Sequence, residues 1–261
     1  MIIKISLQQL QKLFPSAWLE KIQYIHSNLL FRWILRGGSK QLAFSQKSAM
    51  VFSPHQDDET FGCGGMIASK REQGIQVVVV FLTDGQGSGG SNSNSPNEIV
   101  QIRKQEALTA LKILGVEPPE IYFLEKTDGK LQKLNGQERI QTIEQVTELI
   151  KYYQPEEVYV PHKKDCHQDH EATYELIKTA IILAGITVDL LQYPIWLLWR
   201  APLFILLKLQ DIAAANSFSI TLVQEKKNQA IASYPSQIHS LPCGFVKRFL
   251  GSYEIFFKSE Y

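Results

Sequence analysis

Histidine and carboxylate side chains cluster in two short segments of this chain. Residues 54–59 read PHQDDE and residues 161–170 read PHKKDCHQDH, and together they hold four of the six histidines. A catalytic zinc ion takes three protein ligands, from histidine and carboxylate, and keeps one position open for water. A further carboxylate can act as a general base toward water, and a further histidine can stabilise an oxyanion. The two segments therefore predict a metal site suited to amide hydrolysis.

Helix capping is the structural interpretation of the first segment. Asp57 and Asp58 precede a predicted helix, and acidic residues are favoured at helix N-termini. Capping does not explain why the second histidine segment also follows an apolar run. The residues alone indicate that one of the two carboxylates binds the metal and the other acts as base. They do not tell which of Asp57 and Asp58 has which role. Cys166 is a weaker candidate for a ligand, because it lacks a coordinating cysteine partner.

Alternating strands and helices position these two segments. Short apolar runs predict buried strands at residues 49–53, 75–82, 120–124 and 157–160. Between and after them, helices are predicted at residues 61–73, 98–114, 137–153 and 171–183. This alternation is typical of βαβ units, so the predicted fold class is α/β, a mostly parallel sheet with helices on both faces. Ligands bind at the carboxyl ends of such strands, where the loops at 54–60, 83–97, 125–130 and 161–170 should converge.

Residues 1–46 are predicted to form a helical extension packed on a domain of residues 47–261. Apolar residues recur there at helical spacing: Leu7, Leu10, Leu13, Phe14, Trp18, Ile22, Ile25, Leu29 and Leu30. Basic residues interleave with them, which also fits a helix lying on a membrane surface: Lys21, Arg32, Arg36 and Lys40. The most apolar run, residues 190–207, is a poor candidate for a membrane span because two prolines and Arg200 interrupt it.

Composition argues against several other classes of protein. A hydrophobic content of 44% and a charged content of 20% are those of a globular protein. The net charge of +1 provides no basic field, so no nucleic-acid partner is expected. Three dispersed cysteines without a C-x-x-C pattern favour a reducing compartment. The first residues lack a signal-peptide pattern, so we expect a cytoplasmic protein, with the membrane surface as the other location.

The two histidine segments also resemble those of a known family. PHQDDE is similar to the Pro-His-x-Asp-Asp-Glu signature of the LmbE-like, or PIG-L, zinc-dependent N-deacetylases, and residues 167–170 match its His-x-Asp-His element. Shorter similarities occur at residues 61–65, 83–85, 103–107, 123–129 and 227–237, so the resemblance covers roughly residues 48–240. It implies a Rossmann-like fold.

The resemblance implies a role for each residue of the site. One Zn²⁺ per chain, or Fe²⁺ in its place, would be bound by His55, Asp58 and His170. Asp57 would be the general base and His167 would stabilise the tetrahedral oxyanion. Asp169 would orient a histidine, as carboxylates often do beside zinc.

Several other residues have two interpretations each. His162 either faces substrate or is a satisfied loop histidine, and Arg103 either contacts substrate or pairs with an acid such as Glu106. The glycines between 62 and 65 do not form G-x-G-x-x-G, so they indicate close packing of a helix on the sheet rather than a dinucleotide site. Aromatic residues of the 190–207 run either stack on a sugar or pack in the core: Tyr193, Trp196 and Trp199.

The expected function is removal of an N-acyl group, acetyl in the simplest case, from an N-acetylglucosamine-type sugar conjugate. The partner is thus a small amino-sugar conjugate, lipid-linked if the apolar N-terminal segment and the 190–207 run meet a membrane. Two other classes remain: a metal-dependent esterase or phosphoesterase using the same site, and a non-catalytic sugar- or nucleotide-binding module. The oligomeric state is not indicated by the sequence.

Overall fold

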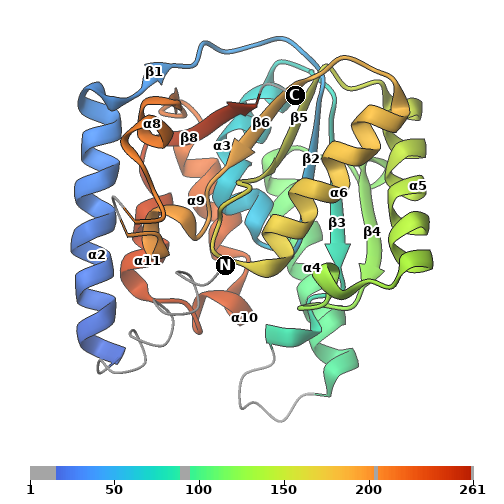
Figure 1. The fold of residues 1–261 in the computed structure, drawn as a ribbon, viewed down its shortest axis with the longest axis horizontal. Helices are drawn as coiled ribbons and strands as arrows, with labels where there is room; N and C mark the ends of the chain where they lie inside the picture. The colour runs from blue at the N-terminus through green and yellow to red at the C-terminus, as the bar shows by residue number, and fades with distance from the viewer. Residues whose placement is uncertain (1–15, 89–94, 203–204, 260–261) are drawn as a thin grey trace.

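One sheet with helices on both faces forms the centre of the molecule (Figure 1). The computed structural model describes residues 16–88, 95–202 and 205–259. Its strands are β1 (Lys40–Gln41), β2 (Ala49–Ser53), β3 (Val77–Thr83), β4 (Ile121–Lys126), β5 (Glu157–Pro161), β6 (Asp189–Tyr193), β7 (Ala215–Ser219) and β8 (Tyr253–Ser259). The predicted α/β class, with a mostly parallel sheet, is confirmed.

Helices connect and cover these strands. The longer ones are α2 (Ser16–Trp33), α3 (Asp58–Glu72), α4 (Pro96–Leu114), α5 (Gly136–Tyr153), α6 (Gln168–Ala184) and α9 (Gln224–Ala232). Shorter ones are α7 (Leu197–Arg200), α8 (Leu209–Ala213), α10 (Pro235–Ile238), α11 (Cys243–Phe249) and the π-helical turn η1 (Ile34–Gly38). Within the described part of the chain, none of the helices is long and apolar enough to cross a membrane.

The strand order puts the two histidine segments next to each other. The order is β1-β7-β8-β6-β5-β2-β3-β4, with β8 antiparallel to β6 and β7 and the remaining pairs parallel. From β2 the chain moves to β3 and β4 on one side, then returns to β5 on the other side. The order therefore reverses between β2 and β5, which is where open α/β sheets bind ligands.

Alternation along the central strands separates two apolar cores. On β3, Val77, Val79 and Phe81 face one core, whereas Val78, Val80 and Leu82 face the other. The first core also contains buried residues of α3, α4, α9 and α11, and the second contains buried residues of α5 and α6. A strand buried on both faces reads as a continuous apolar run, which is why β2, β3 and β5 were predictable from sequence.

Four strands lie where no strand was expected. β6 contains the first residues of the 190–207 run, and α7 lies further along the same run. β7 and β8 follow later in the chain. Residues 40–41 form β1, which pairs with β7, so the N-terminal 46 residues are not entirely helical. The expected helical positions before residue 16 lie outside the described residues, and the proposed boundary at residue 46 stays a prediction.

The glycines of α3 allow a close approach of this helix to its neighbours. A Cβ atom on Gly62 would overlap the ring of Tyr193, and one on Gly65 would overlap Ile220. Tyr193 is fully buried, and its hydroxyl donates to the Phe52 carbonyl at 2.8 Å. The contacts support close packing as the reason for this glycine cluster.

We expect Gly62→Ala to lower the free energy of unfolding by about 1–3 kcal/mol, because the added methyl group forces Tyr193 from a packed position. Urea denaturation of the variant measures this loss. The matched control is Gly136→Ala in α5, where a Cβ meets nothing within 4 Å and alanine favours the helix. Equal destabilisation of both variants would contradict the packing argument.

Candidate active site

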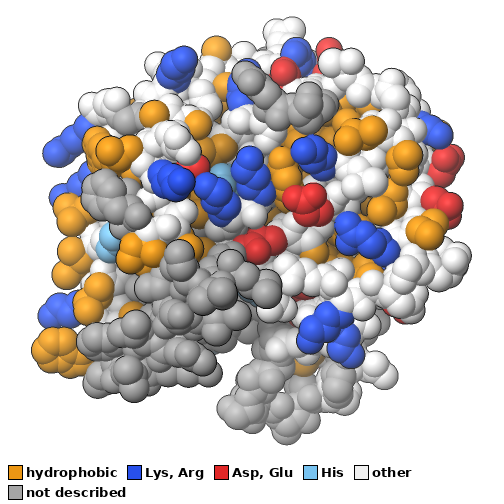
Figure 2. All heavy atoms as spheres, in the orientation of Figure 1, with side chains coloured by type: hydrophobic (Ala, Val, Ile, Leu, Met, Phe, Trp, Pro, Cys, Tyr) orange, Lys and Arg blue, Asp and Glu red, His pale blue; other side chains and the backbone are white. Residues whose placement is uncertain are grey.

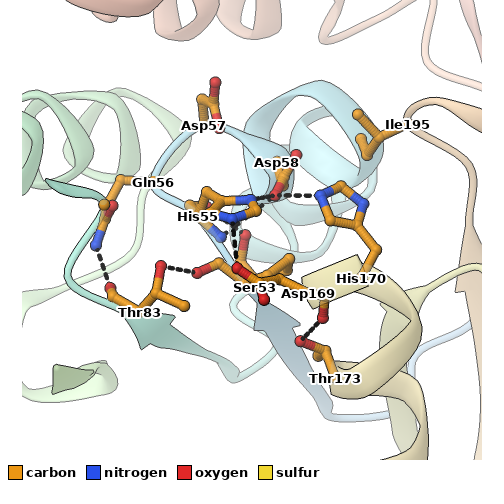
Figure 3. A network of polar contacts seen from close by, with 12 residues as sticks. Ser53, His55, Gln56, Asp57, Asp58, Thr83, Asp169, His170, Thr173 and Ile195 are labelled. Carbon is orange, nitrogen blue, oxygen red and sulfur yellow. Dashed lines mark hydrogen bonds and ion pairs between the residues drawn. The ribbon is translucent and has the colours of Figure 1, made fainter. Parts of the chain in front are cut away.

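The site lies at the carboxyl ends of β2 and β5, where each strand turns into a helix (Figure 3). His55 and Asp57 belong to the β2–α3 turn, and Asp58 is the first residue of α3. Asp169 and His170 occupy the first turn of α6. All five side chains are buried, so their charges depend strongly on one another.

The carboxylate of Asp58 lies between two histidine rings. Its Oδ2 atom is 2.9 Å from His55 Nδ1 and 3.2 Å from His170 Nε2 (Figure 3). Burial alone would raise the pKa of Asp58, but His170 and His55 outweigh it and hold that pKa well below its usual range. Asp58 is therefore an ionised carboxylate facing two ring nitrogens.

Buried or half-buried carboxylates lie beside the opposite nitrogen of each ring. His170 Nδ1 is 2.7 Å from Asp165 Oδ2, and His55 Nε2 is 3.1 Å from Asp128 Oδ1 and 3.3 Å from Asp169 Oδ2. A carboxylate only accepts hydrogen bonds, so each of these nitrogens donates its proton outward from the centre. This leaves the inner nitrogen, Nδ1 of His55 and Nε2 of His170, to face Asp58. The arrangement matches the carboxylate–histidine pairs found beside protein-bound metals.

Three observations indicate that a divalent metal fits this centre. His170 Nε2 is buried without a hydrogen-bond partner in the described structure, although Asp58 is close. Nitrogen atoms of His55, His167 and His170 lie within 4.8 Å of one another. The donors are imidazole and carboxylate, which suit zinc or iron. The ligand set His55, Asp58 and His170 stays a prediction, and His167 adds a third histidine beside it.

Asp57 has a strained backbone and a raised side-chain pKa. Its φ is 144°, a conformation that costs a non-glycine residue about 1–3 kcal/mol and is found mostly at functional sites. Burial, and then the charge of Asp58, raise the pKa of Asp57 to about 8. Adjacent carboxylates thus have opposite shifts, which is how one is kept as a charged group and the other as a proton carrier. Sequence reasoning from the residues alone could not separate their roles.

Arg103 lies beside Asp57 rather than on the surface. Its guanidinium is 3.5 Å from Asp57 Oδ1 and donates to the carbonyls of Gln56, at 2.9 Å, and Gly85, at 3.1 Å. The Glu106 carboxylate, the partner considered from sequence, accepts instead from the backbone and hydroxyl of Ser236. Arg103 therefore fixes two loops of the site, and its contact with substrate stays a prediction.

His167 presents a half-buried, neutral imidazole ring. Burial, followed by the charges of His170 and His55, lowers the pKa of His167 to about 3. Its Nδ1 atom lacks a hydrogen-bond partner in the described structure, and its ring centroid is 4.6 Å from that of His170. A neutral imidazole can donate one N–H to a developing oxyanion, as the expected role requires.

The remaining four candidates contact other parts of the fold. His162 Nδ1 accepts from the Lys164 backbone at 3.1 Å and its ring packs on Phe257 at 4.8 Å, so it behaves as a satisfied loop histidine, and a role toward substrate stays a prediction. Tyr193 and Trp199 are buried in the core, and Trp196 stacks on Phe245 at 4.3 Å. These aromatic rings pack the fold, which was one of the two interpretations.

Sequence reasoning missed three carboxylates that complete the site. Asp165 accepts the backbone N–H groups of Ile195, Trp196 and Leu197 at 2.9–3.0 Å while contacting His170. Asp128 was noted only as part of a loop. Glu59 accepts from Thr60, from the Asp57 backbone and from the Tyr234 hydroxyl, and is fully buried. Asp165, two residues before His-x-Asp-His, belongs to no sequence pattern, and Glu59 ends the Pro-His-x-Asp-Asp-Glu signature without an assigned role, so the fold reveals what each acid contacts.

Fold and site together define an α/β protein with a cluster of histidines and carboxylates, suited to a divalent metal, at the switch point of its sheet. Comparison with protein families agrees: residues 50–181 match the model of the PIG-L family, described as GlcNAc-PI de-N-acetylase. That match covers half of the chain, and the chain belongs to this family, whose reaction class is hydrolytic N-deacetylation.

Individual relatives share parts of the chain. An uncharacterized deacetylase of Escherichia coli strain K12, YaiS, is 31% identical over 51% of this chain and 67% of its own length. The 4-oxalmesaconate hydratase of Pseudomonas putida is 29% identical over 53% of each chain. In fold, N,N'-diacetylchitobiose deacetylase from Pyrococcus horikoshii superposes with a TM-score of 0.62 at 22% identity, covering 82% of this chain and 84% of that one. The alignments thus span half to two thirds of the curated relatives.

Replacing Asp165 with asparagine should weaken metal binding roughly 10- to 100-fold, because an amide cannot accept from three backbone N–H groups and from His170 together. Competition with a chromogenic zinc chelator measures the affinity independently of activity. Asp189→Asn, an exposed carboxylate in a surface ion pair, is the control and should leave affinity unchanged. An Asp165→Asn protein that binds zinc as tightly as wild type would contradict this positioning role.

The acidity of Glu59 predicts a pH-dependent stability. Burial raises the pKa of Glu59 from 4.5 to about 7, so the folded chain holds a proton that the unfolded chain has lost across that interval. Stability of wild type therefore falls as pH rises from 4.5 to 7, and Glu59→Gln removes this loss.

Between pH 4.5 and pH 7, the unfolding free energy of Glu59→Gln should rise relative to that of wild type by about 3 kcal/mol. This is the free energy that corresponds to a pKa shift from 4.5 to about 7. Urea denaturation with a chelator present provides the measurement. Glu148→Gln, whose side chain is 76% exposed, should follow wild type at every pH. A pH-independent difference for Glu59→Gln would disprove the assignment.

Proposed function

We propose that this chain is a zinc-dependent hydrolase that removes the N-acetyl group from an N-acetylglucosamine-type sugar conjugate. The observation that carries the proposal is a pair of adjacent buried carboxylates whose pKa values are shifted in opposite directions. Asp58 lies between two histidines and has a lowered pKa, and Asp57 beside it has a raised pKa. Family membership supports the reaction class, and the imidazole and carboxylate donors support zinc, with iron(II) as the other metal.

The residues that would hold the metal are His55, Asp58 and His170. When bound there, zinc supplies a Lewis acid that polarises a carbonyl and makes water more acidic. Asp165, Asp128 and Asp169 accept the outer protons of the histidines and fix the direction of their inner nitrogens. Metal binding would displace the inner proton of His55, so affinity should increase with pH.

Asp57 is positioned to move the protons of the reaction. As a base it accepts the proton of the attacking water, and as an acid it returns that proton to the departing amine. Its strained turn is held by the Glu59 carboxylate, which accepts the Asp57 backbone N–H at 3.1 Å. His167 donates an N–H to the oxygen of the tetrahedral intermediate from the neighbouring turn, and Arg103 stabilises the ionised form of Asp57.

The sugar conjugate is proposed to be lipid-linked. The GlcNAc-PI named in the family description joins an amino sugar to a larger group, and α2 exposes apolar side chains next to basic ones. The expected membrane-surface location rests on the same helix.

A hydration reaction is the second candidate, because a relative of similar identity is a 4-oxalmesaconate hydratase. Both reactions use water as a reactant. They differ in the product, since deacetylation releases acetate and an amine, whereas hydration adds water to a substrate without release.

The first test is metal content and acetate release together. Wild type purified without added metal should hold about one zinc or iron ion per chain, and Asp58→Ala with His170→Ala should hold none. Wild type should release acetate from N-acetylglucosamine conjugates. In Asp57→Asn, kcat should fall roughly 10²- to 10⁴-fold while metal content stays at the wild-type level.

Asp189→Ser is the matched control, because it removes a surface carboxylate and should preserve both metal content and kcat. A wild-type protein that takes up no metal would overturn the metal site. A protein that holds metal, leaves every acetylated sugar intact and hydrates 4-oxalmesaconate would replace the deacetylase proposal with the second candidate.

A further inference from the structure

Helix α2 has a row of large apolar side chains exposed to solvent. The exposed fractions are 69% for Trp18, 52% for Ile22, 52% for Ile25, 62% for Leu29 and 44% for Trp33. Their spacing of four, three, four and four residues places them on one face of the helix. We call these five residues the α2 stripe.

The α2 stripe is not needed to attach the helix to the protein. The opposite face of α2 already packs through Leu30 and, just after the helix, Ile34, which join a core with Leu197, Leu198 and Ala201 of the α7 region. Tyr24 fits against Gly244 of α11. A helix that is apolar on a second, solvent-facing side indicates a surface that meets another apolar phase.

Charge is distributed unevenly between this part of the chain and the rest. Residues 1–46 contain six basic residues and one acid, a net charge of +5, whereas the whole chain carries +1, so residues 47–261 carry −4. Lys21, Arg32 and Arg36 lie on or directly after α2. Figure 2 shows orange and blue side chains alternating along the left edge of the molecule, which α2 occupies in Figure 1.

We propose that the α2 stripe docks on the surface of an anionic membrane. Tryptophan is enriched at the water–lipid interface, and Trp18 and Trp33 stand near the two ends of the stripe. Basic residues on an amphipathic helix add attraction to anionic lipid headgroups. The helix lies in the plane of the interface, with its packed face toward the protein.

A second copy of the chain fits this surface less well. A symmetric dimer through α2 would bring two positively charged helices together, and like charges at an interface are unfavourable. An anionic bilayer instead neutralises Lys21, Arg32 and Arg36 while it covers the apolar side chains. Leu209 of α8, 51% exposed, extends the apolar surface, since α8 contacts η1 at the end of α2.

Docking through α2 would hold the active site at a fixed position relative to the membrane. α2 packs on α7, and the backbone groups at the start of α7 hold Asp165, which contacts His170. The docking surface is a property of the chain whatever reaction the site performs, so its failure would leave the proposed deacetylation intact.

The test is flotation of the full-length chain with vesicles of phosphatidylcholine alone or mixed equally with phosphatidylglycerol. Wild type should bind the anionic vesicles at least tenfold more than the neutral ones, and binding should fall as salt rises. Ile22→Ser combined with Leu29→Ser should lower binding to anionic vesicles at least tenfold. Lys21→Glu with Arg36→Glu should do the same, and this second variant keeps the apolar side chains in case the serine variant does not fold.

The matched control is Ile182→Ser with Leu183→Ser in α6, whose side chains are 62% and 60% exposed, and its binding should equal that of wild type. Wild type that does not float with anionic vesicles overturns the proposal, and so does equal loss of binding in the control. A concentration-dependent dimer that the α2 variant abolishes, without vesicle binding, would assign the surface to a second copy instead.

Discussion

The position of the Asp58 carboxylate between His55 and His170 is the constraint on which the rest of the site depends. The two rings come from turns separated by more than a hundred residues in sequence and are brought together because β2 and β5 are neighbours. A buried charge is costly unless it is paired, so each ring needs its own carboxylate on the far side. Asp165, Asp128 and Asp169 meet that need, and backbone N–H groups satisfy their remaining oxygens. The result is a small group of charges that is stable only in one arrangement.

Polar contacts deeper in the protein hold α3, and therefore Asp58, in that arrangement. Glu254 of β8 accepts the backbone N–H groups of Gly65 and Met66 at 2.6 and 2.8 Å and pairs with buried Lys227 at 2.7 Å. Breaking such a pair from one side would leave an uncompensated buried charge. Together with the glycine contacts of α3, these bonds explain how the strained turn at Asp57 persists. Strain of this kind survives only where the surroundings over-determine the conformation.

The central part of the fold could be predicted because its strands are buried on both faces and its helices are long. The Gly115 stop and the capping boxes at Ser95 and Asn135 are local signals of the same kind. By contrast, β7 reads ANSFS and β8 reads YEIFFKS, short mixed segments whose strand character depends on their neighbours in the sheet. Motif spacing placed the histidines and the Asp57–Asp58 pair near one another, as observed. It could not identify Asp165, an isolated acid, or assign a role to Glu59, although Glu59 ends the first motif, because the partners of both side chains are set by the fold.

The region after the family match forms hydrogen bonds with a residue of the site. The match ends at residue 181, yet the three amides that hold Asp165 come from residues 195–197, between β6 and α7. A shift of that segment would move Asp165, turn the His170 ring and change the geometry at Asp58. Because α2 packs on α7, the same segment joins the N-terminal helix to the histidine. Residues beyond the family match therefore help to set the position of the His170 ring.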